Sequence, residues 1–194
     1  MDAAVARLVQ LLGVPGEVVG RVPWDSSCAE VGFDFPEDFR DFIDTYGSIV
    51  LNKLLHIWSP QLAPNRFNAP SGLSSFSHYV WFSSRDGGQG VLRGRLRSRW
   101  PATQPYPIWP EEGGLILWGN SPRRHQCYWA TEGGDSNSWP IVVWFNETEW
   151  LRFDMPFSQF LLEVVSGDSE LSEELIDGGL PQTIALEQTG GWGG

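Results

Sequence analysis

The chain is poor in the residues that most often build metal and catalytic centres. Its 194 residues include 2 cysteines and 3 histidines, and no histidine forms an HxH or HxxxH pair with another. The residues concerned are Cys28, Cys127, His56, His78 and His125. A zinc site needs about four such ligands at close spacing, so we expect no metal site and no cofactor. Each cysteine stands beside apolar residues and is expected as a buried thiol.

Long apolar runs and enzyme motifs are also missing. No stretch approaches the roughly 20 apolar residues of a membrane-spanning helix. The first residues, MDAAVARLVQLLG, begin with an acid and space their apolar residues as on a helix face. A secretory signal has a basic start and an unbroken apolar core, so we expect a cytoplasmic protein without a membrane partner. The sequence contains no phosphate-binding loop, dinucleotide fingerprint or nucleophile elbow.

Basic residues are outnumbered, with 13 Lys and Arg against 24 Asp and Glu, a formal net charge of −11. Residues 168–194 carry six of the acids and no Lys or Arg. Nucleic-acid binding requires a basic footprint, so we expect no direct nucleic-acid partner. An acidic surface suits a basic protein partner, because it steers and orients a positive surface. The alternative is that the charge serves solubility alone.

The N-terminal part predicts helices and a loop. Residues 2–12 have helical spacing, with Asp2 as the N-cap. Pro15 can open a second short helix that ends near residue 19. Residues 21–31, with a proline and a serine pair, are interpreted as a loop that lays a tryptophan over the core.

Residues 36–47 form the clearest helix of the sequence. Asp34 can cap it, Pro36 suits its first turn, and its apolar residues recur at i, i+3, i+4 and i+7. The apolar residues are Phe39, Phe42, Ile43 and Tyr46, and the other side carries Asp38, Asp41 and Asp44. We expect this other side to be a solvated acidic face. A catalytic pair of carboxylates would need a buried cleft to separate the two pKa values.

Short apolar runs separated by Gly, Asn, Asp and Ser clusters fill residues 115–153, a pattern typical of antiparallel strands joined by hairpins. The runs are residues 115–118, 127–131, 141–145 and 150–153. Residues 48–58 are also strand-like, because their apolar residues lie on one parity. Prolines then interrupt the chain, and residues 73–82 are either a helix or the beginning of a strand.

Two further patterns carry alternative interpretations. Four arginines alternate with other residues between 93 and 99, which on a strand forms either an anion-binding strip or a charged surface segment that pairs with the protein's own acids. Trp129, Trp144 and Trp150 are expected to pack in the core, and a stacking platform for sugars or bases is the alternative. Partial exposure, as in an interface anchor, is expected of three tryptophans beside turns and prolines: Trp109, Trp118 and Trp139.

Several motifs, taken in order, resemble the SMI1/KNR4 family, also called the SUKH superfamily. They are PEDFRDF…YG at residues 36–47, GGLILWGN at 113–120, WPIVVW at 139–144 and FDMPFSQFL at 153–161. The resemblance covers residues 5–167. It implies one α+β domain with N-terminal helices, one bent mixed or antiparallel sheet of about five to six strands, and a C-terminal helix. Residues 168–194 would follow it as an acidic, Gly-ending tail.

The resemblance also implies a function without catalysis. Bacterial relatives are commonly immunity proteins that bind and neutralise a cognate toxin, often a nuclease or deaminase, of polymorphic or contact-dependent systems. Fungal relatives are scaffold or signalling proteins in cell-wall regulation, which is the alternative. We expect a monomer or weak dimer. An enzyme acting on a carbohydrate or nucleotide ranks last, with only the tryptophan count and scattered histidines in its favour.

One departure from the family marks the expected partner contacts. Relatives often have an Asn-Gly-Asp-like turn after the central strand, whereas residues 121–126 here read SPRRHQ, a basic loop in which we expect an exposed His125. A nucleophile pair of this histidine with Cys127 is disfavoured, because Cys127 begins an apolar run. We expect partner contacts from the loops bordering the sheet: Glu111, Glu112, Arg123, Arg124, His125, Glu132, Asp135 and Trp139.

Overall fold

A computed structural model describes residues 1–14, 22–60, 105–107, 109–146, 148–178 and 184–186. Its helices are α1 (Ala3–Leu12), α2 (Trp24–Val31), α3 (Glu37–Tyr46), the 3₁₀ turn η1 (Ser136–Ser138), α6 (Phe157–Ser166) and α7 (Ser172–Ile176). Its strands are β1 (Ile49–Leu51), β2 (Leu55–Ile57), β3 (Leu115–Asn120), β4 (Gln126–Ala130), β5 (Ile141–Phe145), β6 (Glu149–Phe153) and β7 (Ile184–Leu186). The expected helix after Pro15, the segment 73–82 and the arginine segment 93–99 lie outside these residues.

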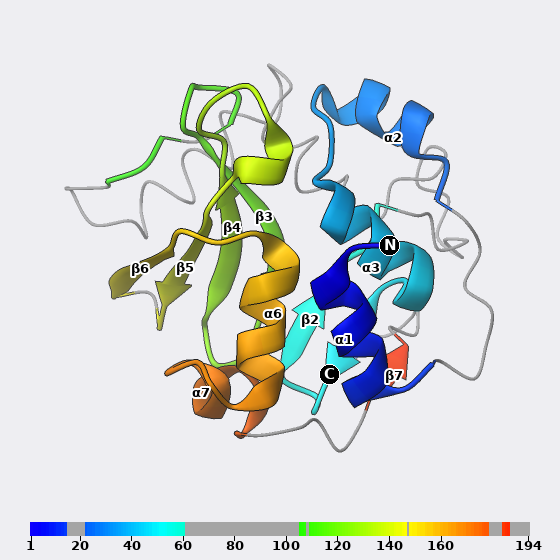
Figure 1. Ribbon diagram of the computed structural model, residues 1–194. Helices are drawn as coiled ribbons and strands as arrows, with labels where there is room; N and C mark the ends of the chain where they lie inside the picture. Colours follow the sequence, from blue (N-terminus) through cyan, green and yellow to red (C-terminus); the bar gives the residue numbers. More distant parts are fainter. Residues whose placement is uncertain (15–21, 61–104, 108, 147, 179–183, 187–194) are drawn as a thin grey trace, which may run out of the picture.

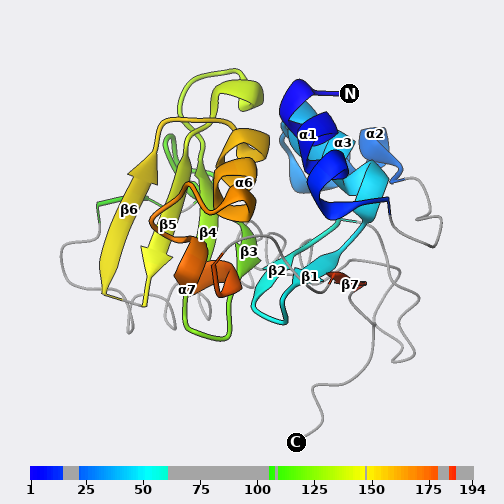
Figure 2. The same cartoon turned by 60° about the horizontal axis from the view of Figure 1, so that its bottom comes forward.

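The described strands form one antiparallel sheet in the order β6-β5-β4-β3-β2-β1-β7. Helix α6 runs over the face of the β3–β5 part, and α1 and α3 lie beside it over β1 and β2 (Figures 1 and 2). The predicted α+β class, with N-terminal helices and a helix after the last long strand, is confirmed. β7 joins from beyond residue 167 and adds a strand to the five or six expected.

Both faces of the central strands β3, β4 and β5 are buried. On the inner face, Trp118 of β3 and Trp129 of β4 pack against Phe157 of α6, with ring centroids 5.0 and 6.4 Å apart. On the outer face, Trp144 is buried and stacks on Trp150 at 5.4 Å. The expected packing of the strand tryptophans is confirmed. The expected partial exposure of Trp118 is wrong, since its side chain is 0% exposed under α6.

The segment expected as one strand, residues 48–58, is a hairpin. Asn52 and Lys53 make its turn with positive φ angles of 49° and 61°, a conformation that asparagine tolerates better than most residues. The turn pairs Leu51 with Leu55, so the apolar residues of both strands stay on one face and are buried. The apolar residues keep the same odd-numbered spacing on both sides of the turn, so the sequence pattern looked like a single strand.

The segment expected as a loop, residues 21–31, contains helix α2. The helix has Asp25 in its first turn and ends at Gly32, whose φ of 83° is the left-handed conformation that glycine adopts easily. Trp24 does lie over the core, with its ring 5.5 Å from that of Phe35, and its indole N–H donates to Asp44 at 3.0 Å. These tertiary contacts of Trp24 stabilise a helix in a segment whose sequence pattern does not predict one.

Of the three acids expected on a solvated face of α3, Asp44 is exposed, whereas Asp38 is buried and Asp41 is half-buried. Asp38 is 8% exposed and accepts 2.7 Å hydrogen bonds from the backbone N–H groups of Phe39 and Ser158. The second bond caps the first turn of α6, and burial raises the pKa of the Asp38 carboxyl. Asp41 accepts from the N–H of Asp2 at 2.6 Å. These carboxylates join three helices.

Asp2 caps α1 as expected, accepting from the N–H groups of Ala4 and Val5 at 2.8 and 3.1 Å. Asp34, expected to cap α3, instead lies 3.5 Å from the guanidinium of Arg40. The N-cap position of α3 is Pro36, which has no side chain able to accept. The free N–H groups at the start of α3 therefore need an acceptor from another part of the chain.

The described part of the expected acidic tail packs on the domain. Leu171, Leu175 and Ile176 are buried in the same core as α1 and α6, and β7 pairs with β1. The boundary after residue 167 stays a prediction. Among the described residues, no helix combines the length and the apolar character that crossing a membrane requires.

Candidate partner-binding site

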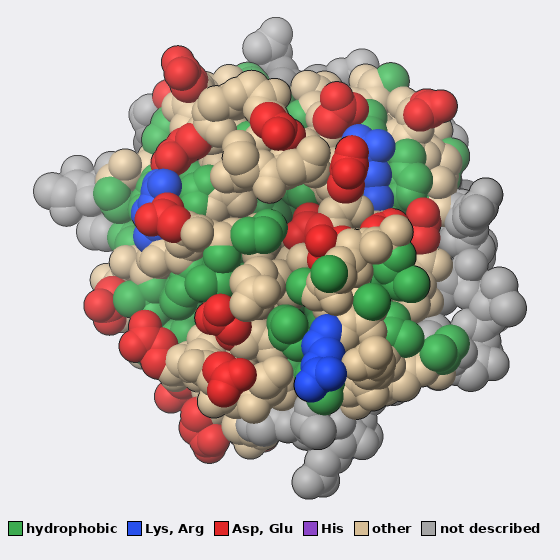
Figure 3. Space-filling model, in the orientation of Figure 1, with side chains coloured by type: hydrophobic (Ala, Val, Ile, Leu, Met, Phe, Trp, Pro, Cys, Tyr) green, Lys and Arg blue, Asp and Glu red, His purple; other side chains and the backbone are tan. Residues whose placement is uncertain are grey.

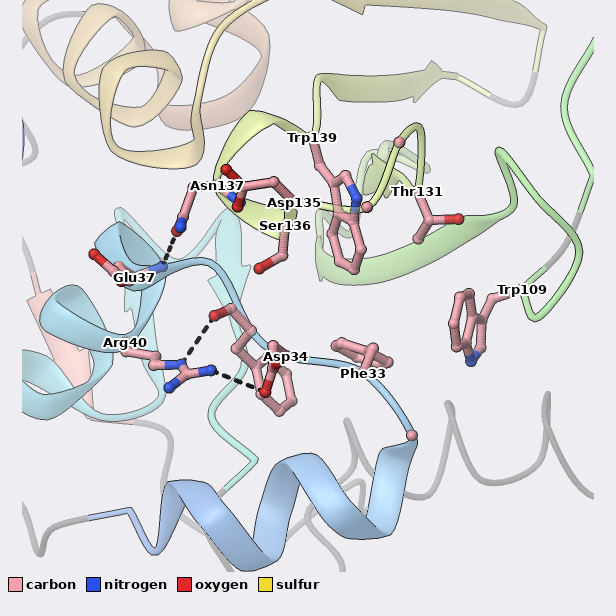
Figure 4. Close-up of a pocket in the computed structure, with 14 residues that line it drawn as sticks. Phe33, Asp34, Glu37, Arg40, Trp109, Thr131, Asp135, Ser136, Asn137 and Trp139 are labelled. Atoms are coloured by element: carbon pink, nitrogen blue, oxygen red, sulfur yellow. Dashed lines mark hydrogen bonds and ion pairs between the residues drawn. The ribbon is translucent and has the colours of Figure 1, made fainter.

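A cleft of about 530 Å³ opens between the start of α3 and the loop that joins β4 to β5. Figure 4 shows the side chains of its two walls. One wall is the α2–α3 connection with the first turn of α3, and the other is the β4–β5 loop, residues 131–139. This volume falls within the range of about 300–1,000 Å³ that is typical of ligand pockets. We call it the cleft below.

A hydrogen bond between residues 100 positions apart holds the two walls together. The side-chain oxygen of Asn137 accepts from the backbone N–H of Glu37 at 2.8 Å and so caps α3, whose own N-cap is a proline (Figure 4). Asp135 in turn accepts from the backbone N–H of Asn137 at 3.0 Å. The loop is therefore ordered by its own acid and fixed to α3 by its asparagine.

Aromatic residues line the cleft, among them Phe33, Trp109 and Trp139. Phe33 lies between Trp109 and Trp139, with ring centroids 5.6 and 5.9 Å away. Trp109 is half-buried, as expected, whereas Trp139 is only 6% exposed. The expectation of a partly exposed Trp139 is wrong, because its ring packs inward against Phe33. It supports the wall of the cleft, while Trp109 is only partly buried.

The charges of the cleft are mostly negative. Arg40 is its one cation among the described lining residues, and it lies 3.5 Å from Asp34 and donates to the backbone oxygen of Phe35 at 2.9 Å. The carboxylates of Glu37 and Asp135 are exposed at the rim. Acidic side chains are also spread over the face of the molecule shown in Figure 3, with few basic ones among them.

The eight sequence-predicted residues fall at opposite ends of the β3–β4 pair. Gly113, before β3, and Thr131, after β4, are joined by a 3.1 Å backbone hydrogen bond. Near that end lie Glu111, Glu112, Glu132, Asp135 and Trp139, and the turn at the other end carries Arg123, Arg124 and His125. Of these, Asp135 and Trp139 line the cleft. The structure does not gather the eight into one site.

Glu132 faces a second cavity of about 410 Å³ beside the cleft. Its carboxylate accepts from the guanidinium of Arg152 at 2.5 and 3.0 Å, and Arg152 also binds Asp154 at 2.7 Å. The hydrogen bond from Arg152 lowers the pKa of Glu132. Glu132 is thus already paired within the protein.

The basic turn between β3 and β4 contacts another segment of the same chain, at the end of α7. Arg123 donates to the backbone oxygens of Glu173 and Glu174 at 3.1 and 3.3 Å and pairs with Asp177, so it binds the C-terminal end of α7. Arg124, with a φ of 68°, is exposed. A basic loop that looked available to a partner therefore fixes the α7 segment through one of its arginines.

The prediction that His125 is exposed is wrong. Its side chain is 2% exposed and stacks on Phe145 at 4.5 Å. Its Nδ1 accepts from the backbone N–H of Asn146 at 3.1 Å, and its Nε2 lies 3.6 Å from Glu174. Burial lowers the pKa of His125, and burial raises the pKa of the Cys127 thiol, which opposes a nucleophile pair between them.

Sequence reasoning missed the α3 side of the cleft. Phe33, Asp34, Glu37, Arg40 and Trp109 line it, and of these the sequence pointed only to Trp109, as an interface anchor. The helix pattern of residues 36–47 located Glu37 and Arg40 correctly but assigned them only to a helix. No local signal pairs this helix with a loop 100 residues away, so the cleft could not be foreseen.

The described residues contain no group of three or more His, Cys, Asp or Glu side chains placed to hold a metal ion. No protein-family model, curated protein or solved structure matches the chain. The fold defines an α+β domain with a cleft at one end of an antiparallel sheet. The likeness to the SMI1/KNR4 family rests on the sequence motifs.

Proposed function

We propose that this protein is a non-catalytic binding protein of the SMI1/KNR4 type that captures a basic toxin, a nuclease or a deaminase, and covers its active site. The observation that carries the proposal is the set of exposed acids at one end of the sheet, around an aromatic cleft. Glu37 and Asp135 lie at the rim of the cleft, and Glu111 and Glu112 are exposed in the turn before β3. The sequence motifs and the net charge of −11 support the same function.

Such a surface would act in two stages. Its negative potential would accelerate encounter with a basic partner and orient it. Aromatic side chains such as Trp109 would then contribute most of the affinity, because anchors of this type dominate interface energies. Neutralisation needs no turnover in this scheme, since occlusion of the toxin's active site is sufficient.

Co-expression with the product of the neighbouring gene tests the proposal. If that product is a toxin, we expect the intact chain to restore growth and to co-purify with the toxin. The variant Glu111→Gln/Glu112→Gln should lower the association rate, and more steeply at low salt. Asp168→Asn/Glu170→Gln is the matched control, because it removes the same charge from exposed positions elsewhere. No protection and no complex would contradict the proposal.

A scaffold protein with several partners is the second candidate. It is favoured by the exposed acids of the α7 segment: Asp168, Glu170, Glu173 and Asp177. Deleting residues 168–194 would not test it, since this also removes Leu171, Leu175 and Ile176 from the core. The variant Asp168→Asn/Glu170→Gln tests it instead. A scaffold that docks through this segment should lose partner binding in that variant and retain it in Glu111→Gln/Glu112→Gln.

A further inference from the structure

The inner face of β6 lacks the helical cover that the neighbouring strands have. Residues directly opposite each other on β5 and β6 share this face, where Ile141 pairs with Phe153 and Val143 pairs with Leu151. Both β5 residues are 0% exposed, whereas Leu151 and Phe153 are partly exposed. Figures 1 and 2 show α6 over the β3–β5 part and no described helix over β6. The described helical layer therefore ends between β5 and β6.

Four apolar side chains of this region are partly exposed and also pack on the core: Phe145, Leu151, Phe153 and Met155. We call them the β6 strip. The rings of Phe153 and of Phe160 in α6 lie 5.1 Å apart, so the strip continues the apolar floor on which α6 rests. Figure 3 shows hydrophobic side chains gathered over β5 and β6, with acidic ones around them. An apolar patch with a polar border is typical of an interaction surface.

The border of the β6 strip is negative. Glu149 begins β6, and Asp154 follows its last residue. Glu163 follows Phe160 by three residues and so lies on the same side of α6. The guanidinium of Arg152 is already paired with two carboxylates. A second copy of this chain would bring a border of the same sign, and anionic lipid would be repelled in the same way, so the strip suits an apolar surface flanked by Lys and Arg.

One helix of a partner has the dimensions to cover β6. The five residues of β6 span roughly 17 Å at about 3.4 Å a residue, which equals about 11 residues of helix at 1.5 Å each. Packed helices lie about 8–10 Å apart, or about two strand spacings. A helix at this distance from α6 would lie over β6 and complete the layer.

We propose that the β6 strip binds a basic amphipathic helix of the partner protein. The helix would place its apolar face on Leu151 and Phe153. Its Lys and Arg side chains would face Glu149, Asp154 and Glu163. The identity of the partner rests on the proposed function, whereas the docking surface follows from the burial and charge around β6. Binding of one apolar helix face is a recurrent mode of peptide recognition, in which burial supplies affinity and flanking charges supply orientation.

A fluorescein-labelled helical peptide of Leu and Lys, about 14 residues long with Leu on one face, is the probe for the full chain. Its scrambled isomer, with the same composition and charge but no apolar face, is the control. Fluorescence anisotropy gives the two Kd values, and amide NMR shifts locate the site. We expect the amphipathic peptide to bind at least about 10-fold tighter, with the largest shifts in residues 149–155 and 159–163. Equal binding of the two peptides, or shifts confined to other surfaces, overturns the proposal.

Leu151→Thr should raise the Kd of the amphipathic peptide by about 5-fold or more, because it removes apolar contact area and keeps a strand-forming residue. Val50→Thr, at a partly exposed position of β1, is the matched control and should leave the Kd unchanged. Leu151→Met keeps an apolar side chain and should keep the affinity of the parent chain. Unchanged binding in Leu151→Thr, or an equal loss in Val50→Thr, overturns the proposal.

The charges are tested in variants that leave the β6 strip intact. Glu149→Gln/Glu163→Gln should raise the Kd by about 3-fold at low salt and by less at high salt. The second substitution keeps an acceptor for the 3.0 Å hydrogen bond from Gln159. Asp25→Asn/Glu111→Gln removes the same charge from exposed positions on α2 and before β3, and should have little effect. Equal weakening in both variants would show that overall charge holds the peptide, and would overturn the proposal.

A partner captured by the co-expression test separates the two claims. If the partner's affinity falls in Leu151→Thr and not in Val50→Thr, the β6 strip is a docking surface in the complex. If the partner binds both variants equally well, the helix proposal fails while the proposed function stands. If the peptide binds the strip as expected and no toxin is captured, the proposed function fails and the helix-docking surface stands.

Discussion

The acids between the helices and the acids around the cleft carry the same carboxyl group but differ in role. The first accept hydrogen bonds that join helices, and the second are exposed to solvent. Asp38 and Asp41 face other helices and accept backbone hydrogen bonds from Ser158 and Asp2. At the cleft, the carboxylates of Glu37 and Asp135 lie at the exposed rim. The formal charge of −11 therefore overstates what a partner can meet, since part of it is committed to helix ends.

The comparison also separates two sources of free energy. A carboxylate that satisfies two buried N–H groups stabilises the fold, because those donors would otherwise be buried without partners. An exposed carboxylate contributes little to folding but retains its charge for association. Substitutions should therefore have effects on the free energy of unfolding that fall in order of burial.

Asp38→Ala is expected to have the largest effect. It leaves the N–H groups of Phe39 and Ser158 without their acceptor, and two such losses in a buried site destabilise by about 3 kcal/mol. Urea unfolding would measure this. Asp135→Ala, which removes one exposed hydrogen bond to Asn137, is the control and should lose less than about 1 kcal/mol. An equal decrease in the free energy of unfolding in the two variants would show that the two groups of acids do not differ in their contribution to folding.

The sequence predicted the fold better than the roles of these acids. The four runs in residues 115–153 became β3–β6 because alternation and turn residues are local signals. The helix at residues 36–47 was found for the same reason. The role of Asp38 was not, because its partner Ser158 lies 120 positions away and no periodicity encodes that contact. Spacing alone made the acid look solvated.

The candidate site shows the same limit. Asp135 and Trp139 were chosen from a turn-rich gap and do line the cleft, but Phe33 and Arg40 come from a distant segment. His125 looked exposed in a basic turn, and its burial depends on Phe145 and Asn146 of the next hairpin. Local pattern identifies which loops border a sheet, whereas tertiary packing decides which of their side chains face solvent.

Arg123→Ala provides an intermediate case, since the ion pair with Asp177 is partly exposed. The variant removes two hydrogen bonds to the end of α7, and we expect a loss of about 1 kcal/mol. Amide hydrogen exchange should accelerate in residues 172–177 more than in β3–β5. Arg124→Ala, at the exposed neighbouring position, is the control. Unchanged exchange in α7 would show that packing of Leu175 and Ile176 alone holds the helix.

The His125 imidazole should produce a smaller, pH-dependent effect. Burial lowers its pKa below the ordinary value of about 6.5. The unfolded chain then binds the proton more strongly, so stability is fully present above about pH 6.5 and falls as pH is lowered from there. Unfolding at pH 7 and at pH 5.5 should show this difference, and NMR titration should give the pKa directly. His56, whose pKa burial also lowers, contributes with the same sign.

A titration of His125 above pH 6.5 would contradict this expectation. It would mean that the carboxylate of Glu174, 3.6 Å from Nε2, outweighs burial. His125→Asn in that case would remove a stabilising charge pair at low pH instead of a buried neutral ring. The two outcomes differ in the sign of the pH dependence, so one pair of unfolding curves separates them.

The smallest effect on folding is expected at the cleft. Glu37→Gln/Asp135→Asn keeps an acceptor oxygen for Asn137, and it removes only the favourable charge of Glu37 at the start of α3, a few tenths of a kcal/mol. Urea unfolding of this variant should therefore almost overlay that of the parent chain, while Asp38→Asn, with the same chemical change at one buried site, shifts its midpoint clearly. If the cleft variant proved as destabilised as Asp38→Asn, its carboxylates would be structural, and a loss of partner binding could no longer be assigned to recognition.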